Sequence, residues 1–172
     1  MASYKKAFII GIAAISGVFC LGYQSQSAAK QSLTIGGGRA HFGVHQIRGG
    51  FMPDPRTISV TSGGNLAVTS MGLGSGCRGY ATATPDAIVH YANPAGFLRF
   101  FVRAASGGDT TLVINDARGR WHCDDDGGGS LNPMVDISNP PGGQYDIWVG
   151  SYRAGEQIRG TLPVTELRSQ RP

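Results

Sequence analysis

The segment from Gly119 to Pro133, GRWHCDDDGGGSLNP, gathers side chains that could do chemistry. A tryptophan, a histidine and a cysteine are followed by three aspartates, three glycines and a serine. These residue types suit three kinds of site: a metal site built on carboxylates, a hydrolytic site built on a serine or a carboxylate, or a tight turn whose aspartates accept hydrogen bonds from backbone amides. The spacing of these residues and the elements around them must decide between the three.

A hydrolytic site finds little support. A serine hydrolase needs a nucleophile, a general base and an orienting acid, and its serine commonly stands in a strained turn. The chain has no Gly-x-Ser-x-Gly motif, and nothing marks His90 or His122 as a base for Ser130. Adjacent aspartates in one turn also differ from two carboxylates that face each other across a cleft. We therefore predict no catalytic residues and no enzymatic activity.

Calcium is the better-supported metal hypothesis. Calcium takes six to eight oxygen ligands from carboxylates, amides, carbonyls and water. The acidic loop and its surroundings offer such oxygens from Asp109, Asp124, Asp125, Asp126 and Asn132. Their spacing does not match an EF-hand loop, so a calcium site would combine loops that are distant in sequence. The alternative stays open: an acidic turn that caps its own backbone amides, with its charge balanced by Arg118 and Arg120.

Zinc is a weaker hypothesis. His41 and His45 are spaced as two zinc ligands on one helix would be. Gly43 lies between them in a glycine-rich stretch, which argues against a helix. We interpret both histidines as loop residues.

Two cysteines, Cys77 and Cys123, follow the N-terminal apolar run. An even pair in an exported chain that is otherwise poor in cysteine predicts one disulfide. The three carboxylates after Cys123 would disfavour its thiolate, and there is no Cys-x-x-Cys motif, so a nucleophile or a zinc site is less well supported. A disulfide over this spacing would stabilise the fold by roughly 3–4 kcal/mol.

The N-terminus carries a targeting signal. A short basic segment, MASYKK, precedes an apolar run from Ala7 to Gly22, and small residues follow at Ser27-Ala28-Ala29. This order is typical of a signal peptide, with cleavage expected before Lys30. The rival interpretation is a retained membrane anchor whose domain faces the periplasm. Cys20 lacks the small preceding residue of a lipoprotein signal, so we interpret it as one more apolar residue of the run.

Charge and composition argue against a nucleic-acid partner. The formal net charge is +4, but Lys5 and Lys6 contribute two of these charges from the segment predicted to be removed. The arginines are scattered along the chain and form no recognition motif. Only 15% of the residues are charged, which suits an exported protein that is periplasmic or secreted.

The hydrophobic pattern predicts an all-β fold. The 27 glycines and 9 prolines favour turns over long helices, and no helical periodicity is present. Turn signals separate short apolar runs such as AIVHY, TTLVIND and QYDIWVGSY, which predicts a β-sandwich or jelly roll of about eight strands. The chain then divides into four parts. Residues 1–29 form a signal peptide or anchor, and residues 30–50 form a Gly-rich arm with a short strand at 33–35. The sandwich covers residues 51–168, and a tail follows at 169–172.

One run, FLRFFVR, predicts a half-buried strand. Leu98, Phe100 and Val102 alternate with Arg99, Phe101 and Arg103. Since successive side chains of a strand point to opposite faces, we expect the apolar residues to face the core and the arginines to face solvent.

Aromatic residues offer a candidate binding surface. In QYDIWVGSY, Tyr145 shares a face with the aliphatic residues, whereas Trp148 lies on the other face. Trp148 and Tyr152 are therefore candidates for contacting a ligand if that face is exposed. Trp121, two residues from Cys123, is expected to pack on the disulfide in the core.

The region from Gly50 to Leu167 resembles the bacterial pre-peptidase C-terminal domain family, in its short exported stand-alone form. The resemblance is carried by GFMPDPRTISVTSGG, GCRGYATATPD, DTTLVIND, GRWHCDDDGGGSLNPMVDISNPPGGQYDIWVGSY and TLPVTEL. It implies a compact β-sandwich, often with calcium, of the kind usually attached to secreted proteases and removed on maturation.

Together, the residues and the resemblance predict a non-catalytic exported module. Its role would be binding or structural, in the cell envelope or outside the cell, with a protein or carbohydrate partner that the sequence does not identify. The alternatives are a membrane-tethered subunit of a larger envelope complex and a domain associated with a secreted peptidase.

Overall fold

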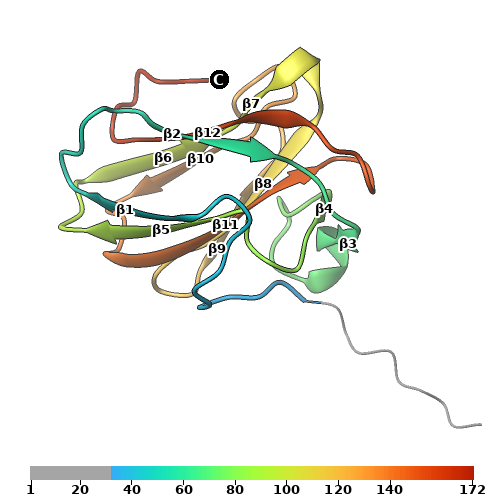
Figure 1. The fold of residues 1–172 in the computed structure, drawn as a ribbon, viewed down its shortest axis with the longest axis horizontal. Coiled ribbons are helices and arrows are strands. Elements are labelled where there is room, and N and C mark those ends of the chain that lie inside the picture. The colour runs from blue at the N-terminus through green and yellow to red at the C-terminus, as the bar shows by residue number, and fades with distance from the viewer. Residues whose placement is uncertain (1–31) are drawn as a thin grey trace, which may run out of the picture.

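Two β-sheets packed face to face make up the part of the chain that the computed structural model describes, residues 32–172 (Figure 1). The predicted all-β sandwich is confirmed, with twelve strands in place of about eight. The predicted signal peptide or anchor at 1–29 lies outside the described residues. Across residues 32–172 there is no helix long and apolar enough to cross a membrane.

The first sheet has β11 (Gly143–Ser151) at its centre. Its order is β1 (Val44–Arg48), β5 (Ala87–Ala92), β11, β4 (Tyr80–Ala81) and β3 (Leu66–Ala67), and β11 also pairs with β8 (Thr110–Asn115), which pairs with β9 (Trp121–Asp124).

The second sheet has the order β10 (Met134–Ser138), β6 (Phe97–Phe101), β12 (Arg159–Thr165) and β2 (Arg56–Thr61), and β7 (Arg103–Ala104) pairs with β12. Short 3₁₀ turns follow β3 at Val68–Met71 and β7 at Ala105–Gly107.

β11 is buried on both faces. Tyr145 and Ile147 point into the main core between the sheets, where Phe100 lies 5.8 Å from Tyr145 between ring centroids. Trp148 points the other way into a second, smaller core with Val68, Ala81, Val113 and Cys77. The chain between β3 and β4 therefore covers the outer face of the first sheet, which the sequence pattern left undecided.

The prediction that FLRFFVR is half-buried is wrong at Arg99, which is 4% exposed. Asp136 on the neighbouring strand accepts hydrogen bonds from Arg99 Nε and Nη2, and the carbonyls of Arg168 and Gln170 accept from Nη1. The C-terminal segment thus covers this face and satisfies the buried guanidinium, as buried charges require. Arg103 is exposed, as predicted.

The Gly-rich arm is bound to the sandwich. The short strand expected at 33–35 is absent from the structure, and β1 at Val44–Arg48 pairs in parallel with β5 instead. Leu33 is buried in the second core, and the Thr34 amide donates to the Ala83 carbonyl. Parallel pairing joins segments far apart in sequence, so no hairpin signal announces it.

The predicted disulfide is confirmed: Cys77 and Cys123 are bonded and join the loop before β4 to β9. Trp121 is partly buried and packs against the second core, with its ring centroid 5.8 Å from that of Trp148. The bond closes over 46 positions of sequence and holds the segment that covers Trp148.

Replacing both Cys77 and Cys123 with serine should lower the free energy of unfolding by about 3–4 kcal/mol, because the unfolded chain loses its cross-link. Urea unfolding of the purified protein under oxidising conditions measures this difference. The unaltered protein unfolded in a reductant is the control and should approach the variant. Equal stability of the variant and the oxidised protein would contradict the prediction.

Candidate binding site

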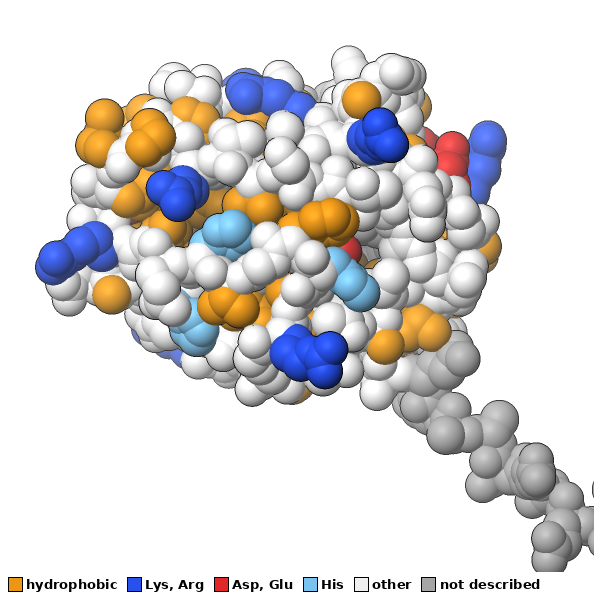
Figure 2. All heavy atoms as spheres, in the orientation of Figure 1, with side chains coloured by type: hydrophobic (Ala, Val, Ile, Leu, Met, Phe, Trp, Pro, Cys, Tyr) orange, Lys and Arg blue, Asp and Glu red, His pale blue; other side chains and the backbone are white. Residues whose placement is uncertain are grey.

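One side of the sandwich is bordered by two edge strands, β1 from the first sheet and β2 from the second. Within residues 32–172 neither strand pairs with another strand on its outer side. Figure 2 shows this face of the molecule, where hydrophobic side chains gather beside Lys or Arg and His side chains and little acidic surface is visible. We call this side, between the edge strands β1 and β2, the open side. Its surface is apolar and basic.

The free edge of β1 presents unpaired backbone groups. The Ile88 amide donates to the Gly43 carbonyl, and the Gly49 amide donates to the Ala92 carbonyl. Alternate residues of a strand direct their amide and carbonyl groups to opposite sides, so those of Val44, Gln46 and Arg48 point away from β5. Such an edge is a template for pairing with another chain.

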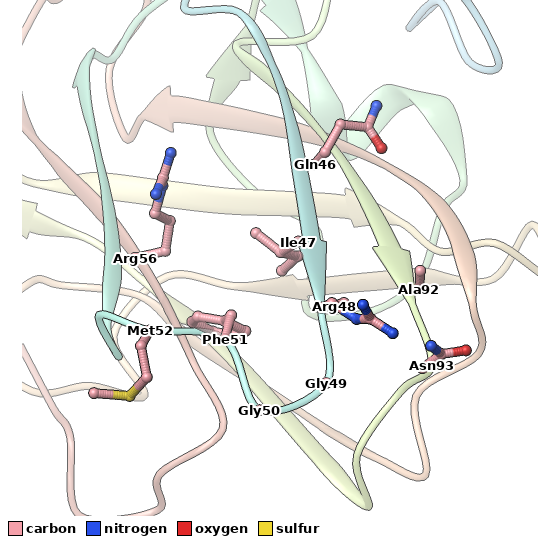
Figure 3. Close-up of a pocket in the computed structure, with 10 residues that line it drawn as sticks. All are labelled: Gln46, Ile47, Arg48, Gly49, Gly50, Phe51, Met52, Arg56, Ala92 and Asn93. Atoms are coloured by element: carbon pink, nitrogen blue, oxygen red, sulfur yellow. The ribbon is translucent and has the colours of Figure 1, made fainter.

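A cavity of about 620 Å³ lies between the ends of β1 and β2, and we call it the edge groove (Figure 3). In Figure 3, Ile47 and Phe51 lie between Arg56 on β2 and Arg48 at the end of β1. Ile47 is buried in the main core and Phe51 packs against it, so both belong to a fixed apolar floor. The remaining lining residues are Gln46, Gly49, Gly50, Met52, Ala92 and Asn93.

Arg48 and Arg56 give the edge groove its charge. Both are exposed, and neither forms an ion pair with any residue in the range 32–172. Met52 is 83% exposed beside them. An apolar floor between two unpaired guanidinium groups suits a ligand that carries both apolar and anionic groups.

The loops around the edge groove are held by the carboxylate of Glu166. The Gly50 amide donates to Glu166 Oε2 at 2.9 Å, and the hydroxyl of Tyr91 donates to Glu166 Oε1. The Ala95 amide in turn donates to the Tyr91 hydroxyl at 2.8 Å. Burial, together with the Glu166 carboxylate, raises the pKa of Tyr91 well above its ordinary value. This network fixes the groove before any ligand binds.

Gly49 is required by the same packing. A Cβ at this position would lie 2.1 Å from the carbonyl oxygen of Asn93. The two loops that close the end of the edge groove therefore approach each other more closely than any side chain allows.

A second cavity, of about 630 Å³, lies near the start of β1 and the end of β2. Its lining includes Asp86, which is 3% exposed and whose Oδ2 accepts a hydrogen bond from the Val149 amide at 2.7 Å. Burial raises the pKa of Asp86 from 3.8 to about 7, although the bond from Val149 opposes the change. The other lining residues are His41, Phe42, Thr61, Ser62, Gly63, Gly64, Asn65, Thr82, Gly155 and Gln157.

The acidic loop uses several of its predicted ligands to cap backbone amides. Asp124 Oδ2 accepts from the amides of Gly127 and Met134, and Asn132 Oδ1 accepts from the Ala104 amide. Asp125 pairs with Arg78 at 3.6 Å. In the described part of the chain, no group of three or more His, Cys, Asp or Glu side chains is placed to hold a metal ion.

Asp109 is the member of this set whose hydrogen bonding is incomplete. Its Oδ1 is buried, and no group among residues 32–172 forms a hydrogen bond with it. Burial raises the pKa of Asp109, and the neighbouring charges of Asp126 and Asp125 raise it further. The fold thus brings Asp109 close to the acidic loop from a separate strand end.

The remaining predicted site residues lie apart. Trp148 is fully buried, so its prediction as a binding surface is wrong, whereas Tyr152 is 46% exposed. His45 lies in β1, so the interpretation of this histidine as a loop residue is also wrong, and its Nε2 is 3.0 Å from the Phe42 carbonyl oxygen.

His122 contacts Asp116 at 2.9 Å. Burial opposes ionisation of Asp116, but hydrogen bonds from His122 and from Arg120 and Arg118 lower its pKa to about 2.

Sequence reasoning missed Arg48, Arg56 and Asp86. Arg48 and Arg56 stand in a stretch interpreted partly as an arm and partly as a strand start, and no spacing rule links them. Asp86 directly precedes AIVHY, where an acidic residue suggests a turn more readily than a buried carboxyl. Their roles follow from contacts between segments that only the fold brings together.

Comparisons with known proteins identify no relative in sequence. No family model matches the chain, and no curated protein matches it. A solved structure, the Aeromonas hydrophila protein PliG, a periplasmic inhibitor of g-type lysozyme, matches with a TM-score of 0.36 and 16% sequence identity. The match covers 71% of this chain and 96% of PliG. A likeness of that size supports no statement about this chain, and the resemblance to the pre-peptidase C-terminal domain family stays a prediction.

Replacing Asp86 with asparagine should stabilise the protein much more at pH 8 than at pH 4.5. The folded state binds the Asp86 proton with a pKa of about 7 and the unfolded state near 3.8, so the stability of the unaltered protein falls as the pH rises from about 4 to 7. Asparagine keeps an oxygen for the Val149 amide, and the gain at pH 8 is at most about 4 kcal/mol. Urea unfolding at both pH values measures it.

The pH dependence of that difference is the decisive observation. Other titrating groups are shared by the two proteins, so their effects cancel in the comparison. An equal gain at pH 4.5 and pH 8 would show that the change acts through packing rather than through ionisation of Asp86.

Proposed function

We propose that this chain is an exported, non-catalytic binding module that takes an extended polypeptide segment along its open side. The segment pairs with the free edge of β1 and places an acidic side chain between Arg48 and Arg56. The observation that carries the proposal is the edge groove: an apolar floor with two unpaired arginines beside a strand edge with unpaired backbone groups.

Backbone pairing supplies affinity in this arrangement. An extended peptide that adds to a sheet edge hydrogen-bonds to outward-facing amide and carbonyl groups, here those of Val44, Gln46 and Arg48. β1 is short and parallel to its neighbour, so the contribution of these bonds is modest. Additional contacts from side chains are needed for a specific complex.

Side chains of the bound segment supply that specificity. Because side chains alternate along a strand, every second residue of the ligand faces the same way. An apolar residue can contact Ile47 and Phe51, and a carboxylate can pair with Arg48 and Arg56, whose exposed charges lack internal partners in the described chain. This combination favours a polypeptide over a carbohydrate as the partner.

Export is supported by the covalent chemistry of the fold. A disulfide such as Cys77–Cys123 persists in oxidising compartments, which for a bacterial chain means the periplasm or the outside of the cell. The signal-like N-terminus leads to the same compartment. We propose the pre-peptidase C-terminal domain-like family as the origin of the sandwich, with a membrane-tethered subunit as the alternative form.

The proposal is tested with a blocked peptide that alternates valine and glutamate, added to the purified protein at low salt. We expect binding that shifts the amide signals of Val44, Gln46 and Arg48 in NMR spectra. Replacing Arg48 and Arg56 with glutamine should weaken binding by about tenfold, since each charge-assisted contact contributes a fraction of a kcal/mol to about 1 kcal/mol at an exposed site.

Two controls separate charge from backbone pairing. Arg118→Gln removes one charge at an exposed turn, as each of the single variants Arg48→Gln and Arg56→Gln does, and it should leave the affinity unchanged. A peptide whose alternate amides are N-methylated keeps its side chains but loses its strand hydrogen bonds, and it should not bind. Equal binding of the methylated peptide, or of a valine–lysine peptide, would overturn the proposal.

We also propose calcium at the acidic loop as a second role, because Asp109 Oδ1 is buried close to other carboxylates and has no hydrogen-bond partner within residues 32–172. A calcium ion would supply the missing contact and reduce the repulsion between Asp109, Asp125 and Asp126. The oxygens of Asp124 and Asn132 that cap amides can still contribute a second lone pair.

The melting temperature in a chelator and in millimolar calcium, at one ionic strength, tests this role. An ion at a hundredfold excess over its Kd stabilises by about 2.7 kcal/mol, which is several degrees for a domain of this size. Asp125→Asn should abolish the shift, and magnesium is the matched control ion. A flat response to calcium would leave the loop as a self-capped turn.

A further inference from the structure

The second cavity contains a feature that the edge groove does not use, the buried carboxyl of Asp86. The two cavities share no lining residue. One carboxyl oxygen of Asp86 accepts from the Val149 amide. Among residues 32–172 no hydrogen bond reaches Oδ1, and no Lys, Arg or His forms an ion pair with Asp86. Asp86 lines this cavity and is 3% exposed.

A buried carboxyl in this state is unfavourable unless something pairs with it. Ionisation costs free energy because the charge has left water, and a cation close to the carboxylate offsets that cost. The described part of the chain supplies Asp86 with one amide hydrogen bond and no paired cation. A ligand that brings a positive charge into the cavity would therefore form an ion pair with the Asp86 carboxylate and offset the free-energy cost of its burial.

The rest of the lining suits a cation that also donates hydrogen bonds. Asn65, Gln157 and Thr82 provide amide and hydroxyl oxygens that accept such bonds. Phe42 is half-buried and adds an aromatic ring, whose face attracts cations. His41 is the other titratable residue of the lining, and its protonation would oppose a cation.

Glycine backbone forms one wall of the cavity. Gly64 packs so closely on Ala81 that a Cβ at this position would lie 2.0 Å from the Ala81 carbonyl carbon. This close packing fixes the backbone that lines the cavity at Gly64.

We infer that this cavity, the Asp86 pocket, binds a positively charged group, a primary ammonium or a guanidinium, that pairs with the Asp86 carboxylate. Such a group can come from a lysine or arginine side chain of a polypeptide or from a free amine. The site does not depend on polypeptide binding at the edge groove. Ionisation of Asp86 lowers the stability of the fold. A residue with such a cost is expected at a site where it binds a ligand.

The test uses n-butylammonium chloride and methylguanidinium chloride as probes, with 1-butanol as the uncharged control of similar shape. At pH 7.5 the two cations should shift the amide signals of residues that line the Asp86 pocket, and 1-butanol should not. Asp86→Asn should weaken cation binding by about tenfold or more, since it removes a charge-assisted contact. Affinity should rise from pH 5 to pH 8 as Asp86 ionises.

A second measurement uses the unaltered protein and does not rely on the variant. Saturating n-butylammonium should lower the midpoint of the Asp86 carboxyl titration, followed by carbon NMR, because the cation binds the ionised form. An unchanged midpoint, or equal affinity of 1-butanol, would overturn the inference. Tighter binding of N-acetyl-lysine amide than of n-butylammonium assigns the pocket to a polypeptide side chain. The reverse order of affinities assigns it to a free amine. Either order of affinities supports a cation site.

Discussion

The central strand β11 must be covered on both faces, and the rest of the fold depends on this constraint. It pairs with β5 and, at Ser151, with β4 on one side and with β8 on the other, and between β5 and β4 its Val149 amide donates to the Asp86 carboxylate. Its side chains still need two apolar environments. The second sheet provides one, and the segment around Val68 and Cys77, with Leu33, provides the other around Trp148. The Cys77–Cys123 disulfide ties that segment to β9.

Polar residues on the same strand attach the N-terminal arm. Asp146 is 3% exposed, and its Oδ2 accepts from the Gly36 amide at 2.7 Å while its Oδ1 accepts from the Gln144 side chain. The arm then continues into β1 along β5. Because β1 adds to the sheet at its border, the fold acquires a strand edge that pairs on one side only within the described residues. The open side is thus a consequence of how the arm is bound.

The two cavities of the open side differ in their electrostatics. The edge groove has exposed arginines and no acidic lining residue, whereas the Asp86 pocket has a buried carboxyl and no lining arginine or lysine. Both are bordered by backbone that packs too closely for a side chain, at Gly49 and at Gly64. The two cavities lie near opposite ends of β1 and favour ligand groups of opposite charge. A partner with an acidic group and a basic group could therefore bind along β1 in one orientation only.

The sequence by itself determined the features that depend on local pattern. Alternating hydrophobicity located most strands, glycine and proline marked the turns, and the even pair of cysteines predicted the disulfide. These properties follow from residues close in sequence or from simple counting, so they can be deduced without coordinates. The calcium site suggested by Asp109, Asp124, Asp125, Asp126 and Asn132 stays a prediction.

Tertiary structure alone decided which faces are covered and which charges are paired. Arg99 alternates like a solvent-facing residue, yet the C-terminal segment buries it against Asp136. Trp148 could have been exposed, and β1 carries too few apolar residues to announce a strand. Arg48, Arg56 and Asp86 acquire their meaning from segments tens of residues away. Burial of a strand's second face depends on long-range packing, which leaves no periodic signal in the strand itself.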